Sequence, residues 1–252
     1  MYIRKTLPIV FVLILALALF AACGSGPDYA VYGNGNIVEQ LFHFDATEGL
    51  GLDISGFRFY GNVNANIIIN ENLSQNITVT TDQNIGQRIT VSEIGSTISI
   101  RAATDSPIAP TQLTISTGLP ITSLVVDGAW YVTDDGSGVD DRLIQLLGAS
   151  SGSFSPGQLD SLHVILGGAA NINMRGMVSN AQFDLSGSAQ VNAFDLIAQR
   201  ATINISGYGS CDITVHEELN ATISGMGRIT FDGSPAVQEQ IDGLGSVTQR
   251  NP

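Results

Sequence analysis

A short phrase recurs through the second half of this chain: an aliphatic residue, then a small or acidic residue, then glycine. It appears as Val126-Asp127-Gly128, Leu166-Gly167-Gly168, Leu185-Ser186-Gly187, Ile205-Ser206-Gly207, Ile223-Ser224-Gly225 and Ile241-Asp242-Gly243. Successive glycines are 40, 19, 20, 18 and 18 residues apart, so the unit is about twenty residues long with one double-length interval. A fixed period of this length is typical of a solenoid, in which each unit buries its apolar face only by stacking on its neighbours.

Aligning the repeats on their glycine reveals apolar columns. The residue before the small-Gly pair is always Val, Leu or Ile, and the residue two positions earlier is also apolar in most repeats. A second column lies four residues after the glycine and consists of Val132, Ile172, Val191, Cys211, Ile229 and Val247. Alternating apolar positions form one face of a strand. The glycine is therefore predicted at a bend between two short strands, where positive φ or close packing favours it.

The repeat predicts an all-β fold, a single-stranded parallel β-helix of about ten rungs of 18 to 20 residues. Helical crossovers between parallel strands need about a dozen residues, which a unit of this length cannot hold beside two strands. A doubly wound α/β fold is thereby excluded. An antiparallel β-sandwich remains an alternative because it also has regular turns, although it does not require like residues to stack in register.

The N-terminus is a separate segment. Residues 1–22 combine a short basic start with an apolar run that ends in small residues, which is typical of a secretory signal peptide. The position of Cys23 resembles a bacterial lipobox, in which the cysteine carries the lipid, and residues 23–30 would then form a flexible tether. A plain signal peptide with an incidental cysteine and an anchoring helix are the alternatives.

Residues 31–252 are predicted to form a single domain, less regular over 31–118 and regularly repeated over 119–252. The double interval contains an acidic, Gly-rich stretch at 134–141 and then 142–147, which reads as a short amphipathic turn or helix. We therefore expect a lateral insertion at about 134–161 that interrupts the solenoid or projects from it. This segment is the one stretch that the repeat does not explain.

Charge narrows the range of partners. Without residues 1–22 the chain has eight arginines and no lysine against 23 acidic residues. Such a surface repels nucleic acid and anionic lipid, so a nucleic-acid-binding role is excluded and any membrane attachment must come from an N-terminal lipid. Cys211 is the second and last cysteine, and its column predicts that it points into the core as a small hydrophobe.

Several stretches together resemble a known family. These are Gly33-Asn34-Gly35-Asn36-Ile37-Val38, Phe44-Asp45-Ala46, Asp82-Gln83-Asn84-Ile85, the serial Ser-Gly phrases and Phe231-Asp232-Gly233-Ser234-Pro235. Their order resembles the putative auto-transporter adhesin, head GIN domain family, over roughly residues 31–250. The resemblance implies a bacterial envelope protein, often a lipoprotein, with a right-handed β-helix. It implies no catalytic residues and no cofactor.

Candidate chemistry is sparse. Asp134, Asp135, Asp140 and Asp141 could offer oxygen ligands to calcium, but they lack the ordered spacing of an EF-hand loop, so they are weak candidates and no metal site is predicted. The three histidines, His43, His163 and His216, have no second ligand at metal spacing. Glycoside hydrolysis needs two carboxylates on adjacent rungs, whereas Asp184 and Asp212 have Asn or Thr beside them. We therefore expect no enzyme activity.

The predicted function is a non-catalytic, lipid-anchored binding or adhesion module of the cell envelope, on the outer side of the cytoplasmic membrane or in the outer membrane. Its partner would be an extracellular glycan or protein. The candidate binding face is a polar column five residues after the glycine: Asn173, Asn192, Asp212 and Thr230. The alternatives are a structural envelope protein that assembles through its exposed end rungs and a polysaccharide-cleaving enzyme.

Overall fold

The computed structural model describes residues 30–44, 49–136 and 138–250. Strands make up 69% of it and helix 2%, so the chain is all-β as predicted. In the described part no helix is long and apolar enough to cross a membrane. The predicted leader, Cys23 and nearly all of the predicted tether lie outside the described residues.

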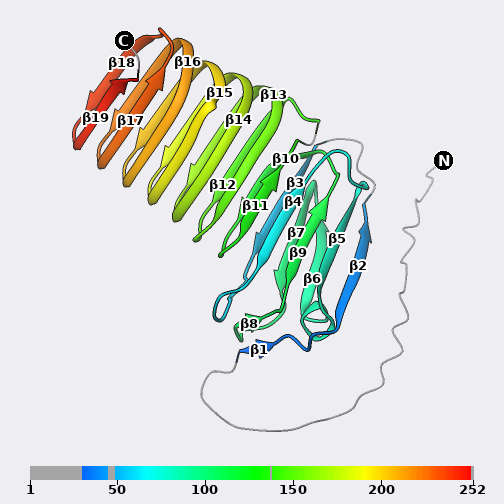
Figure 1. Cartoon of the computed structure of the whole chain (residues 1–252). Coiled ribbons are helices and arrows are strands. Elements are labelled where there is room, and N and C mark those ends of the chain that lie inside the picture. Colours follow the sequence, from blue (N-terminus) through cyan, green and yellow to red (C-terminus); the bar gives the residue numbers. More distant parts are fainter. Residues whose placement is uncertain (1–29, 45–48, 137, 251–252) are drawn as a thin grey trace, which may run out of the picture.

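The C-terminal half is a stack of parallel strands (Figure 1). Its strands are β10 (Ile121–Val126), β11 (Tyr131–Asp134), β12 (Asp141–Leu146), β13 (Ser151–Leu166), β14 (Ala169–Leu185), β15 (Ser188–Ile205), β16 (Tyr208–Ile223), β17 (Met226–Asp232), β18 (Ala236–Ile241) and β19 (Leu244–Gln249). Each turn contributes to two main faces, and in β13 to β16 a short third paired stretch lies between them, for example Gln158 beside Met177. The first face ends at the repeated phrase and the second begins after its glycine. Parallel pairing along both faces excludes the antiparallel sandwich.

The inward columns match the prediction. The first-face column that precedes the small-Gly pair is in register from turn to turn and is buried until the last turn: Val126, Leu146, Leu166, Leu185, Ile205, Ile223 and then Ile241. The second-face column is also buried as far as Ile229 and half-buried at Val247, and Cys211 lies within it between Val191 and Ile229. The core is therefore a continuous apolar column that runs through the stack.

Close packing, rather than backbone conformation, explains most of the phrase glycines. A Cβ on Gly187 would lie 2.0 Å from the carbonyl oxygen of Gly168, and one on Gly225 would lie 2.1 Å from that of Gly207. Those carbonyls accept hydrogen bonds from the next turn, such as Ser188 N–H to Gly168 O at 2.9 Å. Because only Gly128 among the phrase glycines has a positive φ, the constraint is the approach of one turn to the next.

The expected lateral insertion at 134–161 is wrong. β12 pairs in register with β10 and with the second part of β13, so this interval is one more turn of the stack. Its bend is Leu146-Leu147-Gly148, and a Cβ on Gly148 would lie 2.0 Å from the carbonyl oxygen of Gly128. The sequence pattern missed it because Leu147 is neither small nor acidic. The expected amphipathic turn or helix at 142–147 is also wrong: residues 142–146 belong to strand β12, because they pair with β10 and β13.

The N-terminal half is built differently. Its elements are β1 (Val31–Tyr32), β2 (Ile37–His43), β3 (Leu50–Ser55), β4 (Ala65–Ile69), β5 (Asn76–Asp82), α1 (Gln83–Gly86), β6 (Ile89–Ile94), β7 (Thr97–Ala102), β8 (Ile108–Ala109) and β9 (Leu113–Thr117). β3 lies between β7 and β10, and β4 lies between β9 and β11. The turn that β3 and β4 form is therefore out of sequence order in the stack. Three pairs in this half are antiparallel: β2 with β5, β5 with β9, and β6 with β7.

The expected count of about ten rungs is not confirmed. The described residues form about six turns of solenoid-like parallel strands. The estimate was too high because it divided the whole length by the repeat, whereas the antiparallel strands of the N-terminal half extend the sheet without adding turns.

A buried carboxylate ties the N-terminal segment to this end of the sheet. Asp82 accepts hydrogen bonds from the N–H groups of Gly35 and Thr111, both at 2.7 Å, and from the Thr111 hydroxyl at 3.0 Å. Burial by itself would raise the pKa of Asp82, but these hydrogen bonds outweigh it and hold the pKa below its ordinary value. Asn84 adds bonds to Asn34 N–H and Tyr32 C=O. We call this set the Asp82 clasp.

Candidate functional site

A long groove runs across the second face, immediately after the glycine bends. It has a volume of about 820 Å³ and crosses β13, β14, β15, β16, β17 and β19, which lie side by side in Figure 1. Two columns of outward side chains border it, and an inward column of small residues lies between them. We call the two borders the apolar wall and the polar wall.

The apolar wall is the column of residues that directly follow the phrase glycines. Its members, in register, are Ala169, Ser188, Tyr208, Met226 and Leu244. The wall becomes larger and more apolar toward the C-terminal end, where Tyr208, Met226 and Leu244 are 65%, 50% and 75% exposed. Large apolar side chains so exposed in one row mark a surface suited to a ligand.

The polar wall lies two residues further along each strand, on the same outward side. Its members are Ser151, Asn171, Gln190, Ser210, Arg228 and Ser246. Hydroxyl and amide groups of this kind both donate and accept hydrogen bonds. Among the described residues that line the groove, Arg228 is the only charged one. The groove can therefore hold an extended ligand with one apolar side and one hydrogen-bonding side.

The predicted binding face lies beside this groove. Its column, Asn173, Asn192, Asp212 and Thr230, stacks in register as predicted, two residues beyond the polar wall on the same side of the strands. The Asn192 amide donates to the Asn173 side-chain oxygen at 3.2 Å. The structure brings these residues together, and their role in binding stays a prediction. The sequence reasoning missed the apolar wall, although its signal was present one position after each glycine.

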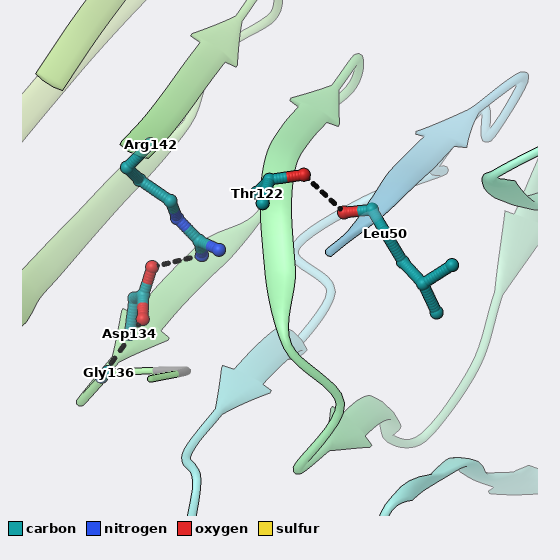
Figure 2. A network of polar contacts seen from close by, with 5 residues as sticks. All are labelled: Leu50, Thr122, Asp134, Gly136 and Arg142. Carbon is teal, nitrogen blue, oxygen red and sulfur yellow. Dashed lines mark hydrogen bonds and ion pairs between the residues drawn. The ribbon is translucent and has the colours of Figure 1, made fainter. Parts of the chain in front are cut away.

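The calcium candidates are not assembled into a site. Asp134 is fully buried and forms an ion pair with buried Arg142, and it also accepts the Gly136 N–H at 3.1 Å (Figure 2). Its neighbour Asp135 and the pair Asp140 and Asp141 are exposed. No cluster of three or more His, Cys, Asp or Glu suited to a metal occurs in the described ranges. The Asp134 carboxylate thus balances a buried guanidinium inside the stack.

Asp184 has partners that the sequence did not predict. It accepts hydrogen bonds from Asn204 at 2.7 Å and Gln182 at 2.8 Å, and it contacts His163 Nε2 at 2.6 Å. Partial burial raises the pKa of Asp184, but these bonds lower it below its ordinary value. No second carboxylate is bonded to this cluster within the described residues.

The remaining candidates are Cys211, His43 and His216. Cys211 is fully buried, which confirms the prediction, and burial together with the nearby Asp212 carboxylate raises the pKa of its thiol. His43 Nδ1 lies 2.7 Å from the Asn76 side-chain oxygen, and His216 is exposed. A buried, protonated thiol does not act as a nucleophile.

Residues 58–235 match the family described as putative auto-transporter adhesin, head GIN domain. The chain belongs to this family. In this head GIN chain the Asp82 clasp joins two of the resembling stretches: it holds the segment before β2 against the end of β5 and the start of α1. No curated protein sequence is similar enough to count as a relative.

Solved structures share the fold. A putative adhesin from Bacteroides fragilis NCTC 9343 is 17% identical with a TM-score of 0.70, covering 87% of this chain and 100% of its own. A putative lipid binding protein from Parabacteroides distasonis ATCC 8503 is 20% identical with a TM-score of 0.62, covering 88% and 99%. A putative adhesin from Parabacteroides merdae ATCC 43184 is 17% identical with a TM-score of 0.57, covering 87% and 98%. At such identities the likeness extends to the fold alone.

Proposed function

We propose that this chain is a non-catalytic adhesion or binding module of a bacterial cell envelope, and that the groove on its second face is the binding surface. The observation that carries the proposal is the groove itself, bordered by Tyr208, Met226 and Leu244 on one side and by hydrogen-bonding side chains on the other. Membership of a family described as putative adhesins agrees with this role. The partner is an extracellular glycan or protein.

The proposal includes a lipid anchor on Cys23. The apolar leader and the small residues before Cys23 support it, and Gly24–Pro27 would separate lipid from domain. A right-handed winding of the stack is also part of the proposal, since connections between parallel strands of one sheet are almost always right-handed. Incorporation of labelled palmitate in cells tests the anchor. Cys23→Ala is expected to lose label and membrane association, whereas the control Cys211→Val retains both. Equal labelling of both variants contradicts the anchor.

An array of extracellular glycans and matrix proteins tests the binding function with the full-length chain. Replacing both Met226 and Leu244 by serine is expected to weaken binding of any retained ligand by about tenfold, because it removes the apolar wall. Serine replacement of Leu41 and Ile94, which are 47% and 72% exposed at the other end, is the matched control. Failure to retain any ligand, or equal loss in both double variants, overturns the proposal.

The final turn argues against the alternative of assembly through the solenoid ends. Glu239 pairs in register with buried Ala221, and Gln249 pairs with buried Phe231, so polar side chains occupy the last positions of two core columns. Inward-pointing charges on an edge strand disfavour pairing with another edge. The enzymatic alternative gains no support from the single-carboxylate cluster at Asp184.

A further inference from the structure

We propose that the groove binds an extended, mostly uncharged glycan that lies along the stack, with one sugar ring per turn and an isolated acidic group at Arg228. This inference rests on the proposed binding function. It adds the class of ligand, the direction in which the ligand lies on the stack, and the residue that binds its acidic group. It is carried by the length of the groove, by the chemistry of its two walls and by its charge.

The length of the groove fits a polymer. Neighbouring strands are about 4.8 Å apart, so the six strands from β13 to β19 that line the groove span about 24 Å. An extended pyranose chain advances by a similar distance for each ring. A chain that runs across the strands therefore presents one ring to each turn, with a hydrogen-bonding side chain beside every ring and a large apolar side chain beside three of them.

The two walls fit the two sides of a sugar chain. A pyranose ring has an apolar face of C–H groups, which packs on Tyr208, Met226 and Leu244, and a rim of hydroxyls, which can bond to amides such as that of Gln190. An acyl chain that lay on the polar wall would displace water from these side chains without offering them hydrogen bonds, which is unfavourable. The open, half-polar groove thus favours a glycan over a lipid tail.

Charge complementarity limits the glycan further. The chain has a formal net charge of −13, yet no acidic residue occurs among the described residues that line the groove. Arg228 takes part in none of the side-chain hydrogen bonds or ion pairs found among the described residues. Its free guanidinium can hold one carboxylate or sulfate by paired hydrogen bonds. A densely charged polyanion, by contrast, is repelled by the rest of the surface.

Calorimetry with the full-length chain tests the inference with defined probes: cellohexaose, mannohexaose and xylohexaose, xylohexaose with one glucuronic acid branch, hexagalacturonate, and oleate. We expect at least one neutral hexasaccharide to bind, and the branched hexamer to bind about tenfold more tightly than xylohexaose. Arg228→Gln should remove that tenfold advantage, and it should weaken the neutral hexamers by much less, because glutamine keeps a hydrogen-bonding group at this position of the polar wall. Tyr208→Ala should weaken neutral and branched hexamers alike by about tenfold, because the loss is of ring contact.

The matched controls are Arg200→Gln and Tyr60→Ala, which change an exposed arginine paired with Glu217 and a 54% exposed tyrosine outside the groove. Circular dichroism of every variant checks the fold. The inference is overturned if no hexasaccharide binds at millimolar concentration, if hexagalacturonate or oleate binds most tightly, or if Tyr208→Ala and Arg228→Gln behave like their controls. A protein ligand on the array with no glycan binding would leave the binding function standing and remove only this inference.

Discussion

From β12 onward, each strand of the C-terminal half pairs with strands of the turn directly before or after it in sequence, whereas β3 and β4 of the N-terminal half pair with strands that lie far away in the sequence. Ile205, for example, pairs with Leu185 and Ile223, while Ile54 pairs with Ile100 and Val126. The first arrangement needs only a repeated column of apolar residues. The second needs specific contacts such as the Asp82 clasp to select its neighbours. The strand register is thus set by repeated apolar columns in the C-terminal half and by specific polar contacts in the N-terminal half.

The largest effect is expected from Ile205→Asp, which places a charge in the core of the regular half. Loss of a fully buried isoleucine and burial of a carboxylate should lower the free energy of unfolding by more than about 4 kcal/mol. Chemical denaturation measures the change, and hydrogen exchange shows whether the neighbouring turns open first. Thr202→Lys, at an outward position of the same strand, is the control. Similar tolerance at both positions would contradict the inward assignment.

Arg142→Met removes one partner of the buried ion pair where the regular half begins. We expect a loss of about 3 kcal/mol in the free energy of unfolding, because Asp134 stays buried and, among the described residues, keeps only the Gly136 N–H to compensate its charge. Adding Asp134→Leu to Arg142→Met should recover much of this loss, since no uncompensated charge remains. A double variant as unstable as the single one would show that the pair contributes more than mutual neutralisation.

Two glycine variants separate close approach from backbone conformation. Gly187→Ala should lower the free energy of unfolding by about 2 kcal/mol, because its Cβ would meet the Gly168 carbonyl at 2.0 Å. Gly95→Ala, in the N-terminal half, has open space but a φ of 63°, so about 1 kcal/mol is expected. Asparagine tolerates this φ, so Gly95→Asn should be milder, whereas Gly187→Asn should not. Equal rescue at both sites would contradict the distinction.

The smallest effect is expected from Asp82→Asn, at about 1 kcal/mol near neutral pH. Because the folded pKa of Asp82 lies below its ordinary value, its contribution is present above the ordinary pKa and is lost as the pH falls through the folded pKa. The variant should therefore be less stable at neutral pH and show a flatter decline in acid. Asp105→Asn, at an exposed position, is the control for urea denaturation across this range. If the free energy of unfolding falls equally steeply with pH in the native chain and in Asp82→Asn, Asp82 is not the cause of the loss of stability in acid.

Much of the regular half was predictable because its pattern is local. The columns before and after the glycine follow from alternation along one strand, and they placed Ile205 inside and Cys211 in the core. The turn at Gly148 was missed because Leu147 departs from the phrase, although its neighbours match the columns. The groove itself was not predicted: the polar column chosen from the sequence lies beside it, and the apolar wall one position after each glycine was not singled out.

The sequence by itself determined the class of fold, the length of the repeat and the residues that point inward, because stacking identical units requires like residues at like positions. Only the tertiary structure decided that β3 and β4 lie out of order, that Asp134 balances Arg142, and that Tyr208, Met226 and Leu244 border one groove. These features depend on which strands become neighbours across long separations. The sequence repeat does not specify which of these distant strands become neighbours, because that depends on packing and on the partners available to buried polar groups.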